Sequence, residues 1–300
     1  MNDKLLQKYL STLTETDEDS ICIGDAIVPV TADKFHLLEK KSADRFVFTD
    51  GGSAAILKSP QACLFYVKIA AVVYGGSKKV DMYESWCIST LKYEDKLVFE
   101  VESDLVPAFT IPAEDMEHEA VIDIARRCME LEVASRYDNV VLDGSFLNMK
   151  DIELKYFQKL KPDAIALSKT SSFISHKGKS PSQILNAKSP NKTWVFDIGN
   201  IDGLQFYFTK LNAYGRHIFK VESVSPVPIE IFERLMSLSN DGVFPGYPYG
   251  LIEADMHARL SNQEKESLRI QALVKSGNAE KIRECESSCD AHSILDNIRF

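Results

Sequence analysis

The order of apolar and polar residues divides the chain into a strand-rich part and a part in which strands and helices alternate. From Phe46 onward, β-branched and aromatic runs follow one another, separated by short turns rich in Gly, Ser, Lys or Asp. This pattern predicts consecutive antiparallel strands. The runs are RFVFTD, CLFYVKIAAVVY, ESWCISTLKYE and KLVFEVES.

A helix is predicted next, over residues 112 to 136, because its acidic first turn suits the positive end of the helix dipole. The pattern then indicates a strand at VVLD, a helix over residues 151 to 160 and a strand at DAIALSK. Strands at WVFDIG, LQFYFTKL and HIFKVES follow, with helices over residues 228 to 239, 251 to 275 and at the C-terminus. The predicted fold class is α/β: a mixed sheet flanked by helices, with additional N- and C-terminal helical elements.

Residues 1 to 42 form a predicted N-terminal extension to a domain that spans residues 43 to 300. We expect a polar helix, a short strand around ICIGDAIVPV and a second helix over residues 32 to 41, available for dimer or partner contacts. The Ser-, Lys- and Pro-rich segment over residues 170 to 193 has little periodicity and is expected to be a mobile loop.

No run of about 18 apolar residues is present, and acids stand where a secretory signal would need an apolar core. We therefore expect a soluble, cytoplasmic protein with no membrane segment. Among six scattered cysteines only Cys285 and Cys289 are close, as C-x3-C, so a structural zinc site is not expected.

A formal charge of −9 argues against broad, non-specific nucleic-acid binding, which needs clustered Lys and Arg. It leaves room for a local basic groove. The lysines that crowd into one acid-poor segment are Lys169, Lys177, Lys179, Lys188 and Lys192.

Two apolar strands that are far apart in the sequence, FVFTDGGSA and VVLDGSF, each end on an aspartate followed by glycine. A carboxylate at a strand end can offer oxygen ligands to Mg²⁺ or Mn²⁺ without burying an unpaired charge in the sheet. Asp50 and Asp143 are therefore candidate ligands. The alternative for each is that Asp-Gly simply makes a turn.

A third acid is expected on the helix that precedes VVLD. Glu132 falls on an apolar stripe that we expect to pack on the sheet, and an acid on a packing face needs a partner or a metal. Glu130 is predicted on the opposite face, as a solvated ion-pair partner. The stripe consists of Val121, Ala125, Cys128 and Ser135, at helical spacing.

The predicted order is strand with Asp, antiparallel strands, helix with Glu, strand with Asp, and a later helix. This is the layout of the ribonuclease H-like fold, in which carboxylates from these elements converge on two metal ions. Two such ions activate water and stabilise the leaving oxygen in phosphodiester hydrolysis.

The chain resembles the NurA nucleases, which work with HerA-type hexameric helicases. The likeness runs from about residue 45 to the C-terminus. The segments that carry it are TDGGSA, the E-x-E helix before VVLDGSF, IALSKTSSF, YFTKL followed by HIFKVES, PGYPYGLIEADMHARLS and AHSILDNIRF.

The resemblance implies a ribonuclease H-like core, Mn²⁺- or Mg²⁺-dependent cleavage of DNA, a homodimer, and docking onto the helicase in end resection or phage defence. Carried over by motif, Asp50 and Asp143 match the two strand acids, and Glu132 matches the helix acid. Asp255 falls at the position that carries a His or Asp in relatives.

Two departures from the family pattern bear on this site. The first motif reads D-G-G-S where D-G-S is expected, and the second glycine could change how Asp50 points. Asp255 and His257 stand two residues apart on a helix, so only one can face the metals, and we favour Asp255.

Lys169 is a candidate contact for the scissile phosphate, and Lys210 is a weaker one; the alternative for each is solvent exposure. Four aromatics could stack on the bases of a single strand, although an aromatic in a strand more often belongs to the core. These are Tyr207, Phe208, Tyr247 and Tyr249.

The leading hypothesis is thus a deoxyribonuclease with exo- or endonuclease activity, in which Asp50, Glu132, Asp143 and Asp255 hold two cations and Lys169 supports the phosphate. One alternative is a non-catalytic adaptor bound to the helicase. Another is a ribonuclease H-like nuclease with a different nucleic-acid substrate.

Overall fold

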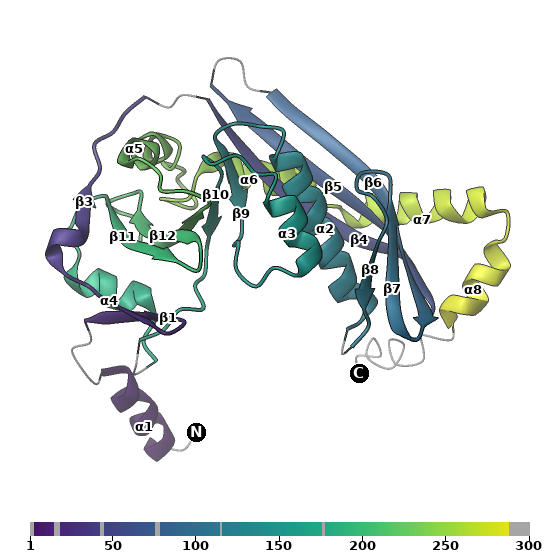
Figure 1. Ribbon diagram of the computed structural model, residues 1–300, viewed down its shortest axis with the longest axis horizontal. Coiled ribbons are helices and arrows are strands. Elements are labelled where there is room, and N and C mark those ends of the chain that lie inside the picture. The colour runs from purple at the N-terminus through teal and green to yellow at the C-terminus, as the bar shows by residue number, and fades with distance from the viewer. Residues whose placement is uncertain are drawn as a thin grey trace.

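The computed structural model describes residues 3 to 14, 19 to 42, 45 to 75, 79 to 114, 116 to 175 and 178 to 287. Within these residues, one large sheet of eleven strands runs through the molecule (Figure 1). In spatial order its strands are β3 (Phe35–Leu37), β11 (Trp194–Ile201), β12 (Leu204–Lys210), β13 (Phe219–Ser223), β10 (Ile165–Ser168), β9 (Val140–Asp143), β4 (Phe46–Ser59), β5 (Ala62–Tyr74), β6 (Lys79–Glu94), β7 (Lys96–Ser103) and β8 (Phe109–Pro112).

The centre of the sheet has the strand order β6-β5-β4-β9-β10. β5 pairs antiparallel with both β4 and β6, whereas β9 pairs in parallel with both β4 and β10. The parallel pairing requires a crossover between β4 and β9, and the helix α2 (His118–Ala134) lies in it. The predicted ribonuclease H-like mixed sheet is confirmed.

Helices cover both faces of this central region (Figure 1). On one face α2 and α3 enclose an apolar core with β5 and β6, and on the other α5 and α6 enclose a second core. The described helices besides α2 are α1 (Asp3–Thr14), α3 (Asp151–Phe157), α4 (Pro181–Lys188), α5 (Ile229–Ser237), α6 (Tyr249–Ala258), α7 (Asn262–Ser276) and α8 (Ala279–Ser287). No described helix is long and apolar enough to span a bilayer.

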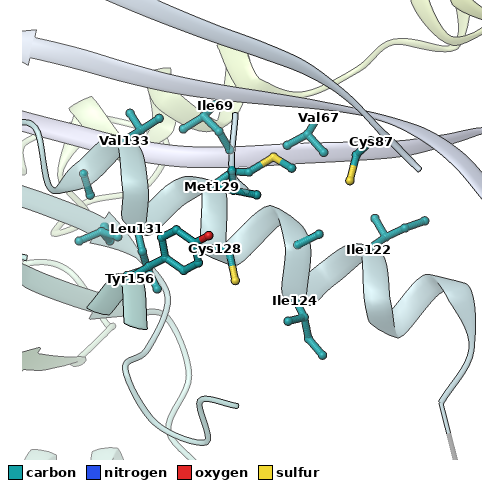
Figure 2. Packing of buried hydrophobic residues seen from close by; sticks show 14 of the residues in the cluster. Val67, Ile69, Cys87, Ile122, Ile124, Cys128, Met129, Leu131, Val133 and Tyr156 are labelled. Atoms are coloured by element: carbon teal, nitrogen blue, oxygen red, sulfur yellow. The ribbon is translucent and has the colours of Figure 1, made fainter. Parts of the chain in front are cut away.

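The helix α2 is buried on two sides. Figure 2 shows Met129 packed against Ile69 and Val67 of the sheet, while Cys128 turns toward Tyr156 of α3. Burial of a large apolar side chain of this kind stabilises the fold by about 1.5–3 kcal/mol. Because the sheet and α3 cover different sides of α2, its buried surface is wider than a single stripe.

The N-terminal segment joins the large sheet at its edge. A hairpin of β1 (Ser20–Ile23) and β2 (Ala26–Pro29) precedes the 3₁₀ turn η1 (Ala32–Lys34) and β3, so the helix predicted over residues 32 to 41 is wrong. β3 pairs with β11, and the Phe35 ring lies 5.0 Å from Trp194 and 4.8 Å from Phe196. Strand pairing and these aromatic contacts outweigh a weak local preference for helix. The domain division at residue 42 stays a prediction.

Two further expectations need correction. The segment over residues 170 to 193, expected to be a loop, contains α4, whose first turn Ser180 caps by accepting a bond from the Gln183 N–H. The helix expected over residues 251 to 275 is two helices, because α6 ends at Ala258 and Ser261 caps the start of α7 at Asn262. Lys177, Cys289 and the motif AHSILDNIRF lie outside the described residues.

We predict that Gly52→Ala destabilises the fold by about 1–3 kcal/mol, because the added methyl group overpacks the contact between β4 and α6. A Cβ atom at position 52 would lie 2.2 Å from the Ala258 carbonyl oxygen, which belongs to helix backbone. Denaturant unfolding monitored by circular dichroism measures the change. Gly242→Ala is the matched control, since a Cβ there meets no atom within 4 Å; equal stability of the two variants would contradict the prediction.

Candidate active site

Asp50 and Asp143 lie at the same level on neighbouring parallel strands. The register pairs Thr49 of β4 with Leu142 of β9, so the next residue on each strand is one of the two aspartates. Adjacent strands are roughly 4.8 Å apart. The second glycine of the DGGS motif therefore does not separate the two acids. The expectation that the first strand ends on Asp50 is wrong: β4 continues through both glycines to Ser59 because they keep their pairing with β5, and only β9 ends on its aspartate.

The two glycines after Asp50 let helices approach β4 from both faces. Gly52 faces the Ala258 carbonyl of α6, as described above, and Gly51 faces α2. A Cβ atom at position 51 would lie 2.3 Å from Oε1 of Glu130. The DGGS sequence thus makes room for a helix carboxylate beside the strand aspartates.

Glu130, and not Glu132, is the acid that α2 brings to this place. Its side chain is buried; Arg126 donates to its Oε1 and also to the Gly51 carbonyl, the latter at 3.2 Å. Glu130 shares one face of α2 with Ile122, Met129 and Val133. This face, at positions i, i+7, i+8 and i+11, is the one that packs on the sheet.

The expected placement of Glu132 is wrong. Its carboxylate is on the α3 side of α2, where Lys159 lies at 2.7 Å and Arg136 at 3.7 Å. The stripe that includes Cys128 and Glu132 does pack, but against α3. A helix buried on two sides has two apolar stripes, and the sequence does not say which of them meets the sheet.

The helix α6 contributes Asp255 to the same cluster. Its charge acts on Asp50, while Arg259 lies 2.6 Å from its Oδ2. His257 is exposed two residues further on. The structure thus brings Asp255, rather than His257, toward the other acids.

The four carboxylates repel one another. Burial, followed by the charges of the three acidic neighbours, raises the pKa of Asp50 to about 8; one N–H donor, from Gly51 at 2.8 Å, opposes the shift. Burial also raises the pKa of Glu130, against the attraction of Arg126 and Arg127. Such a group of acids calls for a cationic partner.

Lys169 and Tyr247 complete the surroundings of Asp143. The Lys169 Nζ lies 2.6 Å from Asp143 Oδ2 and 4.8 Å from the centre of the Tyr247 ring. The Tyr247 hydroxyl is buried and makes no hydrogen bond of ordinary geometry within the described residues. Its pKa is raised, chiefly by burial and then by the charge of Asp143.

The loop that follows Asp143 is held from two sides. On one side, the buried Glu222 accepts bonds from Ser145 Oγ at 2.6 Å and from the Phe146 N–H, and Lys220 lies 2.5 Å from it. On the other side, Arg127 donates to the carbonyls of residues 145 and 147 and pairs with Glu153 at 3.4 Å. The buried Lys220–Glu222 pair fixes the loop because an unpaired buried charge would be costly.

The sequence placed Glu130 on the wrong face of its helix, offered Tyr247 only as a base-stacking candidate although its side chain is buried, and gave no expectation for the contacts that hold the loop after Asp143. The signals were the E-x-E doublet, the PGYPYG motif and the two charges inside the apolar strand HIFKVES. Of the other candidates, Tyr207 and Phe208 belong to the core, and the Nζ of Lys188 donates to the Val30 carbonyl at 3.4 Å rather than to the site.

A cavity of about 200 Å³ opens beside the acids. Glu130, Asp143, Arg126 and Arg127 are among its lining residues, together with Ser145 from the clamped loop. Charged side chains of both signs thus line one cavity on the α2 side of the sheet.

The donor set fits a hard divalent cation. Carboxylates from four different elements, with the buried hydroxyl of Tyr247 near them, provide the oxygen ligands that Mg²⁺ and Mn²⁺ prefer. As the described side chains stand, no three Asp, Glu, His or Cys residues are close enough to hold one ion together. Basic partners occupy three of the four acids: Lys169 on Asp143, Arg126 on Glu130 and Arg259 on Asp255.

Comparison with solved structures finds a similar fold in a known nuclease. The crystal structure of the NurA nuclease from Sulfolobus solfataricus matches over 93% of this chain and 94% of its own, with a TM-score of 0.56 and 16% identity. The endonuclease V of Bacillus subtilis (81% and 89% coverage, TM-score 0.40, 14% identity) and the catalytic domain of human endonuclease V (78% and 92%, 0.39, 12%) are more distant. No family model and no curated protein sequence matches the chain. At 16% identity, the likeness to the NurA structure establishes a common fold.

We predict that Asp50→Asn stabilises the metal-free protein by roughly 1–3 kcal/mol at neutral pH. The raised pKa of Asp50 means that its carboxyl group must take up a proton when the protein folds at neutral pH, whereas Asn is neutral without one. Mn²⁺ should raise the melting temperature of the parent protein and raise that of the variant much less. Thermal unfolding with EDTA and with Mn²⁺ measures both effects.

The control is Asp138→Asn, which removes an exposed carboxylate paired with Lys161 at 2.6 Å. An exposed pair contributes about 0–1 kcal/mol, so this variant should melt close to the parent. A lower melting temperature for Asp50→Asn than for Asp138→Asn in EDTA would contradict the repulsion between the acids.

Proposed function

We propose that this chain is a Mn²⁺- or Mg²⁺-dependent deoxyribonuclease, with exo- or endonuclease activity, that hydrolyses phosphodiester bonds. The observation that carries the proposal is the convergence of Asp50, Glu130, Asp143 and Asp255 from four elements of a nuclease fold. If the two Asp-Gly sequences only formed turns, nothing would explain why four acids lie together at an electrostatic cost. The substrate class is supported by the sequence resemblance to NurA nucleases and by the whole-chain match to one of them.

In this proposal Asp50 and Asp143, level with each other on neighbouring strands, are the central ligands, with Glu130 and Asp255 supporting them from opposite faces of the sheet. When bound, the two divalent ions would supply Lewis acidity and lower the pKa of water. Glu130 replaces Glu132 in this role, since Glu130 lies beside Gly51, next to Asp50, whereas Glu132 lies on the α3 side.

The other residues of the site act on the substrate and on the ligands. Lys169, which pairs with Asp143 in this structure, would contact a non-bridging oxygen of the phosphate when cations neutralise that carboxylate. The Tyr247 ring supports the lysine stem, and the Lys220–Glu222 pair holds the loop after Asp143 so that the carboxylate keeps its direction.

For its partners, we propose a homodimer that docks onto a HerA-type hexameric ATPase, in DNA end resection or phage defence. The support is the order of the NurA-like motifs along the chain and the match over 94% of the NurA structure. The charge of −9 fits this partnership, because a helicase channel can provide the positive potential that attracts DNA.

We predict that Asp143→Asn abolishes cleavage of single- and double-stranded DNA in Mn²⁺, with a loss of at least about 10²-fold. Glu130→Gln should cause a similar loss, whereas Glu132→Gln should retain most activity. The last two are matched: both change one α2 glutamate to its neutral isostere. Lost activity in Glu132→Gln with full activity in Glu130→Gln would reverse the assignment.

We also predict that the isolated protein binds DNA weakly and that the affinity falls steeply with salt concentration. Fluorescence anisotropy at 50 mM and 200 mM NaCl, with and without the purified ATPase, measures this. Tight binding by the isolated protein at high salt would contradict the need for a partner.

One observation favours a second candidate, a non-catalytic adaptor on the same fold. Three of the four acids are neutralised by basic side chains, and in the described residues no three ligands close around one ion. If the protein bound the ATPase but neither cleaved DNA nor gained stability from Mn²⁺, this candidate would replace the nuclease.

A further inference from the structure

Two loops next to the acids present large apolar side chains to solvent. We call them the paired loops: residues 211 to 217, between β12 and β13, and residues 239 to 248, between α5 and α6. Tyr214 on the first loop is 96% exposed, and Val243 on the second is 93% exposed. No other large hydrophobic residue in the described part of the chain is as exposed as these two.

The paired loops are held in place by their own hydrogen bonds. In the first, Asn212 Oδ1 accepts from the Tyr214 and Gly215 N–H groups at 2.9 and 3.2 Å. In the second, Asp241 Oδ1 accepts from the Val243 and Phe244 N–H groups at 2.8 and 2.9 Å. Each exposed side chain therefore stands on a preorganised turn.

The two loops also pack on each other. Asn212 Nδ2 donates to Asn240 Oδ1 at 3.4 Å, and a Cβ atom on Gly215 would lie 2.7 Å from the Pro245 carbonyl oxygen. Such contact leaves little freedom for either tip to fold back and bury its apolar side chain. The exposure is a property of the folded state.

An aromatic cluster connects the paired loops to the acids. Phe244 stacks on Tyr247 at 5.1 Å, and His217 meets the edge of Phe244 at 4.9 Å. Tyr247 in turn lies under Lys169, the lysine that pairs with Asp143. The tips are thus rigidly connected to the site where the phosphodiester bond would be cleaved.

The charge around Tyr214 suits a nucleic-acid strand. Arg216 and His217 are exposed beside it, and Lys210 ends the strand that leads into the loop. A tyrosine ring with nearby cations is the arrangement by which proteins stack an unpaired base and hold its backbone. Burial of Tyr214 against a protein partner would not require these cations.

We infer that the paired loops form a stacking platform for single-stranded DNA, in which the Tyr214 ring packs on an unpaired base of the strand that leads to the acids. The inference rests on the proposed nuclease function for its substrate. It assigns to the paired loops a preference for frayed or single-stranded ends over blunt duplex.

The test uses the Asp143→Asn protein, so that DNA is bound and not cleaved. Tyr214→Ala in this background should lower the affinity for a labelled 16-nucleotide single strand about fivefold or more. Tyr214→Phe should retain it, because phenylalanine keeps the stacking face. A blunt hairpin duplex should be affected less than twofold.

Tyr93→Ala is the matched control, because Tyr93 is 78% exposed at the end of β6 and outside the paired loops. Equal single-strand affinity of Tyr214→Ala and its parent would overturn the inference, and so would an equal loss in Tyr93→Ala. Normal DNA binding with lost association to the ATPase would show that the platform docks protein instead.

This outcome is separable from that of the proposed function. If the wild-type protein cleaved no DNA in Mn²⁺ but single-strand binding still depended on Tyr214, the nuclease proposal would fail and the platform would stand. If Asp143→Asn abolished cleavage but Tyr214→Ala left single-strand binding unchanged, the nuclease proposal would stand and the platform would fail.

Discussion

Mutual repulsion among clustered carboxyl groups, one buried and three partly buried, is the constraint on which this structure depends. Two neighbouring strands, one helix face and one further helix each bring an acid to the same place, although the other three acids raise the pKa of Asp50. A fold selected for stability alone would separate these charges or pair them fully. Here Asp50 has only the N–H of Gly51 as a hydrogen-bond donor among the described residues, and it lies at the centre of the group.

The register of the sheet brings the two strand aspartates together, and close approach of the helices adds the other two acids. Parallel pairing of β4 with β9 sets Asp50 and Asp143 level, because Thr49 pairs with Leu142 and each aspartate is the next residue along its strand. Helices then reach β4 from both faces only because residues 51 and 52 have no side chains. The same pair of glycines therefore serves the packing of the sheet and the approach of Glu130 and Asp255.

Rigidity around the acids comes from other interactions. The Lys220–Glu222 pair and the Arg127–Glu153 pair hold the loop after Asp143, and of these four side chains only Arg127 is more than slightly exposed. The aromatic cluster around Tyr247 extends this rigid region outward to the paired loops. The acids and the paired loops are thus held in place by different sets of contacts.

The sequence by itself predicted the central strands in their order along the chain and the two aspartates that lie level on β4 and β9, because these depend on local periodicity and on motifs. It favoured Asp255 over His257, and Asp255 is the residue that lies near the other acids. It assigned Glu130 to a solvated face, named Tyr247 only as a candidate for base stacking, and missed the buried Lys220–Glu222 pair. Periodicity marks which positions of a helix are buried, but α2 is buried on two sides, and only the tertiary structure decided that Glu130 faces Gly51 while Glu132 faces Lys159. Which of two apolar stripes meets the sheet is settled by packing against residues far away in the sequence, and that information is not contained in the spacing of the helix itself.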